Sequence, residues 1–364
     1  MGALGRDTAS DNTATGVVAL GLNTRGTRNT ADGDSALFHN TSGNDNTASG
    51  MGALQSNTIG TQNTAAGKDA LYSNIGTGSP FDAGNYNSAF GFSTLYANTT
   101  GHRNSAFGHQ ALRSNISGFN NVAVGKFSLP KNTTGSNNTA CGANALDSNT
   151  TGSNNIGIGS EGGTVITTEN NVICIGAPGV VGTSNATYIG NIFTAPVTAG
   201  WVPVLIDPNG KLGTQGSSRR FKNDIEDMAG KSSDLWSLRP VTFHYKDEFA
   251  NGDKSLQYGL IAEEVEKVNP NLVAYDKDGV IYTVRYQLLT PLMLNELQKE
   301  HALNLKQSAT IESLQTQIAA LTIQNAKLAT ENTSMKQSMD DVQAKLQAIA
   351  LKVDALSNKS MSAK

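Results

Sequence analysis

The sequence lacks the features that mark several large classes of protein. No apolar run reaches the roughly 18 residues that a membrane-spanning helix needs, and the first residues contain neither the charged nor the apolar region of a secretory signal. The 27 Lys and Arg do not outnumber the 30 Asp and Glu, so there is no basic excess for binding nucleic acid. We therefore expect no membrane insertion and no nucleic-acid partner, and the sequence predicts no cofactor and no metal site.

Cysteine is also scarce, with only Cys141 and Cys174 in 364 residues. Two cysteines are too few for the disulfide framework of a small secreted domain. They occupy different phases of the repeat described below, and we interpret both as small core residues.

The residues that are abundant are distributed unevenly. Residues 1–216 contain 34 of the 38 glycines but only 9 Lys or Arg and 11 Asp or Glu. Residues 217–364 contain the other four glycines and the other 18 basic and 19 acidic residues. A shift of this size indicates a boundary between two different kinds of structure.

A five-residue element of the form Asn-Thr-Ala-x-Gly recurs along the first part of the chain. Its final glycine advances by 17 residues at every step but one, and a second marker, Ala-Leu, keeps the same period. A fixed period is the signature of a solenoid, whereas a low-complexity disordered tract, the alternative, would not keep such strict register. The final glycines are Gly16, Gly33, Gly50, Gly67, Gly91, Gly108, Gly125, Gly142 and Gly159.

The 17-residue unit is too short for two helices, and its Gly, Asn and Thr content opposes helix. We predict a β-solenoid or β-roll over residues 1–192, with about eleven coils that each hold two short strands joined by tight turns. Asn and Gly suit the left-handed positions of such turns.

The element alternates, so its second and fourth residues share one face and its third and fifth share the other. The second and fourth residues change from Thr30 and Asp32 in an early coil to Ile156 and Ile158 in a late one. We expect that this pair can point inward. Because one coil encloses little apolar volume, we also expect neighbouring chains to complete the core toward the C-terminal end.

The repeat resembles the β-roll heads of trimeric autotransporter adhesins and related repeats in phage and bacterial tail fibres, which use a similar Asn-Ser-Val-Ala-Ile-Gly element. The period of 17 departs from the commoner shorter one. The one irregular step, from Gly67 to Gly91, contains seven extra residues. Insertions in repeat arrays become surface loops, often on the binding face. Phe81, Asp82 and Tyr86 are therefore candidate ligand contacts, and a neutral surface loop is the alternative.

Residues 193–216 break the repeat and are predicted to form a linker with a hairpin, with strands at 202–206 and 211–214 around an Asp-Pro-Asn-Gly turn. Four ordered blocks then resemble the C-terminal intramolecular chaperone domain of phage endosialidase tailspikes and many tail fibres. These blocks are SSRRFKNDI at 217–225, LWSLRPVTFHY at 235–245, YGLIAEEV at 258–265 and VRYQLL at 284–289.

The resemblance implies a small α+β domain over residues 217–295 that assembles the fibre as a homotrimer and then cuts itself off. Carried over by position, it makes Ser217 the nucleophile, Lys222 the general base and Gly216–Ser217 the scissile bond. Ser218 stands where the family often has Asp, and it is a second candidate nucleophile, although it lies four residues from the lysine rather than five.

A serine and a lysine can perform this chemistry. Neutral lysine accepts the hydroxyl proton, and both burial and nearby cations such as Arg219 and Arg220 favour the neutral form. The reaction would be a single-turnover serine autopeptidase reaction within one chain, so proximity replaces a substrate pocket.

A heptad pattern covers residues 296–357, and residues 358–364 are predicted to be a disordered tail. With Ile311 at position a, every d residue from Leu314 to Leu356 is apolar, which predicts a coiled coil. Ile at a, Leu at d, and Asn325 and Asn332 at a favour a dimer, whereas the family resemblance implies a trimer. We expect the trimer, because the compact domain should set the stoichiometry.

Together these features predict a trimeric tail-fibre or adhesin-like protein of a virion or a bacterial surface, with a cell-surface receptor or glycan as its external partner. Because the chain begins within the repeat, an N-terminal anchor is expected to be missing or supplied by another protein. The alternative is a surface adhesin or lattice-binding solenoid, for example an ice-binding one, with an uncleaved C-terminal trimer clamp. The position of Thr30 becomes Ser88, Val122 and Ile156 in later coils, which disfavours a flat threonine lattice.

Overall fold

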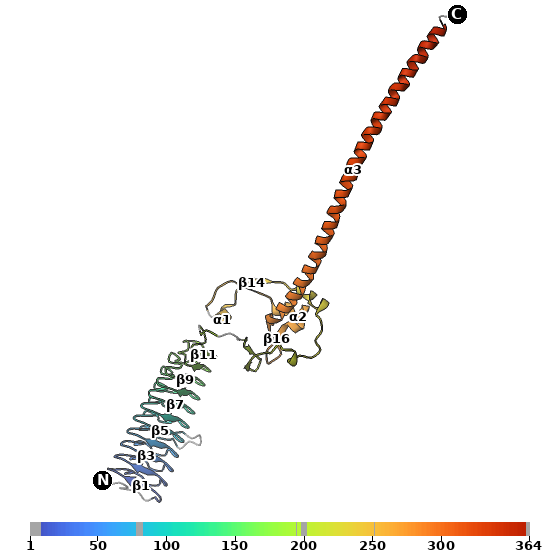
Figure 1. Cartoon of the computed structure of the whole chain (residues 1–364). Coiled ribbons are helices and arrows are strands. Elements are labelled where there is room, and N and C mark those ends of the chain that lie inside the picture. Colours follow the sequence, from blue (N-terminus) through green and yellow to red (C-terminus); the bar gives the residue numbers. More distant parts are fainter. Residues whose placement is uncertain (1–8, 78–82, 194, 198–201, 251, 362–364) are drawn as a thin grey trace. The chain divides into compact units, whose positions relative to one another are not determined.

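The computed structural model describes residues 9–77, 83–193, 195–197, 202–250 and 252–361. The chain divides into two compact units, residues 1–199 and residues 200–364. The first unit is a stack of coils, and the second contains a small α+β domain and a long helix (Figure 1).

Each coil of the first unit contributes one three-residue strand to a single parallel sheet. The eleven strands pair in sequence order, and equivalent positions of the repeat stay in register, as where Ala31 pairs with Ala48 and Ala48 with Ala65. The solenoid prediction is therefore confirmed. The strands are β1 Thr13–Thr15, β2 Thr30–Asp32, β3 Thr47–Ser49, β4 Thr64–Ala66, β5 Ser88–Phe90, β6 Ser105–Phe107, β7 Val122–Val124, β8 Thr139–Cys141, β9 Ile156–Ile158, β10 Ile173–Ile175 and β11 Thr187–Ile189.

The expectation of two strands per coil is wrong, because the rest of each coil is a succession of turns. Several positions per coil have left-handed backbone, which cannot continue a strand. In one coil these are Gln110 with φ 57°, Leu112 with φ 50° and Asn120 with φ 54°. Left-handed leucine is unusual, since this backbone costs an L-residue roughly 1–2 kcal/mol.

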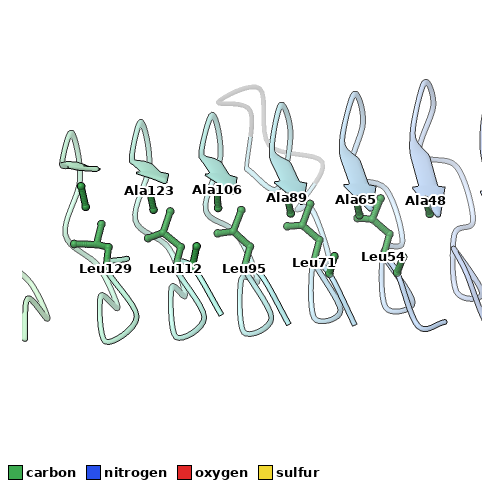
Figure 2. Close-up of a cluster of buried hydrophobic side chains, with 14 of the residues drawn as sticks. Ala48, Leu54, Ala65, Leu71, Ala89, Leu95, Ala106, Leu112, Ala123 and Leu129 are labelled. Carbon is green, nitrogen blue, oxygen red and sulfur yellow. The ribbon is translucent and has the colours of Figure 1, made fainter. Parts of the chain in front are cut away.

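Alanine and leucine fill the interior of the coils. In β2 to β8 the central residue is an alanine that points inward and faces a leucine of the preceding coil, as Ala123 faces Leu112 (Figure 2). Both side chains are fully buried. Burying a leucine contributes roughly 2 kcal/mol, and the N–H of Leu112 also donates to the carbonyl of Ser128 in the next coil at 3.0 Å. Burial and this bond together offset the strained backbone.

Two columns of buried asparagines run through most of the stack. Asn121 accepts a hydrogen bond from the N–H of Asn138 at 3.0 Å and donates to the carbonyl of Gly135 at 2.9 Å. These asparagines were expected at turns, but they are core residues whose amides bond from coil to coil. One column contains Asn29, Asn46, Asn63, Asn87, Asn104, Asn121, Asn138 and Asn155, and the other contains Asn23, Asn40, Asn57, Asn74, Asn98, Asn115, Asn132 and Asn149.

The first and third residues of each strand face outward, so the expectation that this pair can point inward is wrong. Side chains alternate along a strand, and burial of the alanine directs its two neighbours to the outer face. The outer face is polar at Thr30 and Asp32 but apolar in later coils, where Val124, Ile158 and Ile175 are each about two-fifths exposed. We call this row of outward apolar residues, from Phe90 to Ile189, the apolar stripe. Its members are Phe90, Phe107, Val122, Val124, Ile156, Ile158, Ile173, Ile175 and Ile189.

The two cysteines differ in burial because one lies at an inward position of its strand and the other at an outward position. Cys174 takes the place of the central alanine and is buried, which raises the pKa of its thiol. Cys141 holds an outward position of β8 and is exposed. Its interpretation as a core residue is therefore wrong.

The regular asparagine columns end at a buried carboxylate. Ile166 and Val172 occupy the two asparagine positions in the last coils, and Glu169 lies between them. Its carboxylate accepts hydrogen bonds from the N–H groups of Gly182 at 2.5 Å and Thr168 at 3.0 Å. Burial raises the pKa of this carboxyl, but the surrounding backbone N–H groups outweigh it and lower the pKa to about 2. An ionised side chain therefore satisfies the backbone where the amide ladder stops.

The second unit begins with the expected hairpin and continues as a small α+β domain, which confirms the predicted fold class. Strands β12–β13, β14–β15 and β16–β17 pair as antiparallel two-stranded sheets. A small core forms from Val265, Leu272, Val273 and Val284. The elements are β12 Leu205–Ile206, β13 Leu212–Gly213, η1 Arg219–Phe221, η2 Ala229–Ser237, β14 Val241–Phe243, α1 Asp247–Ala250, β15 Gln257–Gly259, α2 Ala262–Val268, η3 Pro270–Leu272, β16 Val273–Tyr275, β17 Ile281–Val284 and η4 Tyr286–Leu288.

Helix α3, Leu289–Met361, contains 73 residues and continues past the predicted end of the coiled coil at residue 357. The heptad d residues are exposed along it, including Leu314, Leu321 and Leu356. Within the described ranges, no helix has the length and apolarity to cross a membrane.

Candidate functional site

A single turn of 3₁₀ helix brings Ser217 and Lys222 together. In η1, the N–H of Phe221 donates to the carbonyl of Ser218 and the N–H of Lys222 to the carbonyl of Arg219, both at 3.0 Å. The turn folds the chain back on itself, and Lys222 Nζ donates a hydrogen bond to Ser217 Oγ at 2.9 Å. Two residues five positions apart thus come into direct contact.

This contact is the kind of arrangement that nucleophilic catalysis by serine requires. An amine within hydrogen-bond reach of a hydroxyl can accept its proton when the amine is neutral. Ser217, Ser218 and Lys222 are all exposed in the single chain. Arg219 and Arg220 are the cations nearest in sequence to this pair. Arg220 stacks on the ring of Phe221, with its guanidinium carbon 4.6 Å from the ring centroid.

A polar cluster that sequence reasoning missed joins the domain to the start of α3. The carboxylate of Glu296 accepts hydrogen bonds from Trp236 Nε1 at 2.9 Å, from Lys299 Nζ at 2.7 Å and from Ser232 Oγ. The bonds from Lys299, Ser232 and Trp236 lower the pKa of Glu296 to about 2. Trp236 and Glu296 are 60 residues apart, so no local pattern signals their contact. The cluster fixes η2 against the helix.

The small domain exposes a large share of its apolar side chains. An open groove of about 720 Å³ lies beside β14 and β15, and Phe221, Trp236 and Tyr258 are each more than half exposed. Soluble monomers rarely expose contiguous apolar surface of this kind. The groove is lined chiefly by Leu235, Leu238, Val241, Tyr258, Leu260, Tyr286, Leu289 and Met293.

The candidate ligand loop is only partly described. Phe81 and Asp82 lie outside the described residues. Tyr86 is exposed with left-handed backbone, and the guanidinium carbon of Arg103 lies 5.9 Å from its ring centroid. Across the described part of the chain, no group of three or more His, Cys, Asp or Glu could hold a metal ion.

Residues 217–274 match the protein family described as Chaperone of endosialidase. The match begins at Ser217 and includes Lys222 and the first three of the four sequence blocks; the fourth, at 284–289, lies beyond it. It identifies the segment as a chaperone of tail-fibre type. No curated protein and no solved structure matches the chain.

Proposed function

We propose that this chain forms a homotrimeric tail-fibre-type protein whose residues 217–295 assemble three copies and then cut the Gly216–Ser217 bond. The fibre comprises residues 1–192 and the linker 193–216, and the coiled coil 296–357 follows the chaperone domain and is released with it. The observation that carries the proposal is the 2.9 Å contact between Lys222 and Ser217 at the start of the matched segment. The proposed location is a virion tail or a bacterial surface, where the fibre meets a receptor or glycan.

The reaction has two balanced steps. Ser217 Oγ attacks the carbonyl carbon of Gly216, and the bond between this carbon and the nitrogen of Ser217 breaks. The hydroxyl proton passes through Lys222 Nζ to the released amine. Water then hydrolyses the resulting ester. Gly216 leaves as a carboxylate, and the hydroxyl of Ser217 is restored.

Assembly would activate this pair. A lysine acts as a base only when neutral, and loss of contact with water favours the neutral form. Ser217 and Lys222 are exposed in the single chain beside the exposed ring of Phe221, and the same domain also exposes an apolar groove and the ring of Trp236. Neighbouring copies that cover these rings would also exclude water from the pair, so cleavage would follow assembly.

Two further surfaces support association of copies. The exposed d residues of α3 form the seam of a coiled coil, which aligns the chains in parallel. Parallel chains bring the same face of each solenoid close to its copies, and the apolar stripe is the face that gains by being covered. Neighbouring chains would therefore still complete the apolar packing of the later coils, but on the outer face of the strands rather than inside the coils.

Light scattering on the full-length Ser217→Ala variant tests the assembly. We expect three times 38.1 kDa, or about 114 kDa. Adding Leu321→Asp and Leu328→Asp on the seam should lower this mass, whereas Thr316→Asp, at an outer heptad position, should not. A mass of two chains would favour the dimer indicated by the heptads, and a mass of one chain would contradict the proposed chaperone.

The uncleaved clamp with a lattice-binding solenoid is the second candidate, and one observation favours it. Thr13, Thr30, Thr47 and Thr64 form an outward column on β1 to β4. The column does not continue, since Ser88 takes the next position and Val122 and Ile156 interrupt it in later coils. A protein that stays in one piece and shapes ice crystals would support this candidate over the first.

A further inference from the structure

The ring of Phe221 covers the α-carbon of Gly216. A β-carbon added to Gly216 would lie 2.7 Å from both Cδ2 and Cε2 of this ring. Carbon atoms pack at roughly 3.5–4.0 Å, so no larger residue fits at position 216 while the ring stays in place. The guanidinium of Arg220 stacks on the same ring, and the hydrogen bond from the N–H of Phe221 within η1 fixes the backbone that carries the ring.

The need for glycine at position 216 is steric. Gly216 is not among the glycines with left-handed backbone, so an L-residue could adopt its conformation. Gly213, three residues earlier, likewise lacks left-handed backbone, but a β-carbon there would meet no atom within 4 Å. The two glycines therefore differ in what surrounds them and provide a matched pair.

We propose that Phe221 is a positioning residue for the self-cleavage reaction and that its ring restricts the residue before the cut to glycine. The inference rests on the proposed cleavage at Gly216–Ser217. Phe221 touches the acyl side of the scissile bond, whereas Lys222, the next residue, touches the nucleophile on the other side. One turn of 3₁₀ helix thus holds both reacting parts.

The reason for such a restraint lies in the freedom of glycine. Glycine samples more backbone conformations than any other residue, so an unrestrained Gly216 would seldom present its carbonyl carbon to Ser217 Oγ. Misplacement by about 1 Å can lower a rate roughly 100-fold. A ring packed on the α-carbon limits rotation of Gly216 without contributing a reactive group, and most of its own surface remains exposed, so its replacement leaves the small core of the domain intact.

The test is a double-mutant cycle on the full chain, with the intact fraction followed over time after cell-free synthesis. We expect Gly216→Ala to slow cleavage by roughly 10- to 100-fold, Phe221→Ala to slow it about 10-fold, and Phe221→Leu to retain more activity than Phe221→Ala. In the Phe221→Ala background, Gly216→Ala should have a much smaller effect, because the ring that it would strike is gone. Gly213→Ala should be cleaved at the wild-type rate.

The outcomes separate the two proposals. Slow Gly216→Ala, normal Gly213→Ala and partial rescue in the double variant support the positioning role. Gly216→Ala cut at the wild-type rate, or effects of the two substitutions that simply multiply, would overturn it while leaving self-cleavage standing. A wild-type chain that is never cut would contradict the cleavage proposal itself, and with it any role of Phe221 in that reaction.

Discussion

Ser217→Ala is expected to abolish cleavage, leaving a chain that runs as a single full-length band where the wild type runs as two. The substitution removes the only atom of residue 217 that can form an ester with the carbonyl carbon of Gly216. Removing a nucleophile lowers enzymatic rates by factors of roughly 10⁶. Denaturing gels of the purified variants are sufficient to observe an effect of this size.

Ser218→Ala is the matched control, because Ser218 is also exposed and adjoins the same turn. It should be cut normally, since Lys222 Nζ contacts Ser217 Oγ. Lys222→Met should slow the cut by roughly 10²–10⁴-fold, the usual contribution of a general base. If Ser217→Ala is cut and Ser218→Ala is not, the nucleophile is Ser218 and the assignment is wrong.

Asn121→Leu is expected to destabilise the solenoid by about 3–5 kcal/mol, although the two side chains have similar size. The substitution leaves the N–H of Asn138 buried without a partner, and it removes one further hydrogen bond each from the side chains of Asn104 and Asn138 and from the carbonyl of Gly135, which keeps its bond from Asn132. Each such group costs about 1–3 kcal/mol when it loses its hydrogen bond. Denaturant unfolding followed by circular dichroism should show the loss.

Ser117→Ala provides the control for this change. Ser117 belongs to a neighbouring coil, and its side chain is exposed. Its replacement should change the free energy of unfolding by no more than about 0.5 kcal/mol. Equal stabilities for Asn121→Leu and Ser117→Ala would show that the buried amide columns do not hold the coils together.

The period of the repeat carried most of the information about the first unit. It predicted stacked coils and parallel strand pairing, because every coil repeats the same contacts at the same register. It could not show which face is inward. Val122 and Ala123 point to opposite faces whichever of them is buried, and the small alanine can line the core only because Leu112 fills the rest of the coil.

The role of asparagine was the feature that the sequence predicted least well, because residues expected at turns are buried in the core. The preference of asparagine for turns is a local property, whereas the columns of the solenoid depend on contacts 17 residues away, such as that between Asn115 and Asn98. The available signal was that asparagine itself recurs at the same position of successive coils. Turn residues that only supply backbone freedom would vary from coil to coil. Position 120, which is left-handed and exposed, does vary along the repeat, where Arg28, Gln62 and Tyr86 take the equivalent place.

At the candidate site, the resemblance of the surrounding blocks to the chaperone family predicted Ser217 and Lys222 as a pair, since their spacing alone carries little information. Their meeting depends on one local turn, η1, which short-range hydrogen bonds form. The contact of Phe221 with Gly216 and the cluster around Glu296 could not be predicted. The first depends on a side-chain rotamer, and the second joins residues more than 60 positions apart.

Intact-mass spectrometry of the purified wild-type chain tests the central claim most directly. Self-cleavage at Gly216–Ser217 predicts two species, residues 1–216 and residues 217–364, whose masses add up to that of the chain plus one water. The second species should begin at Ser217. A single species with the mass of the full chain, from a preparation that light scattering shows to be trimeric, would contradict the claim.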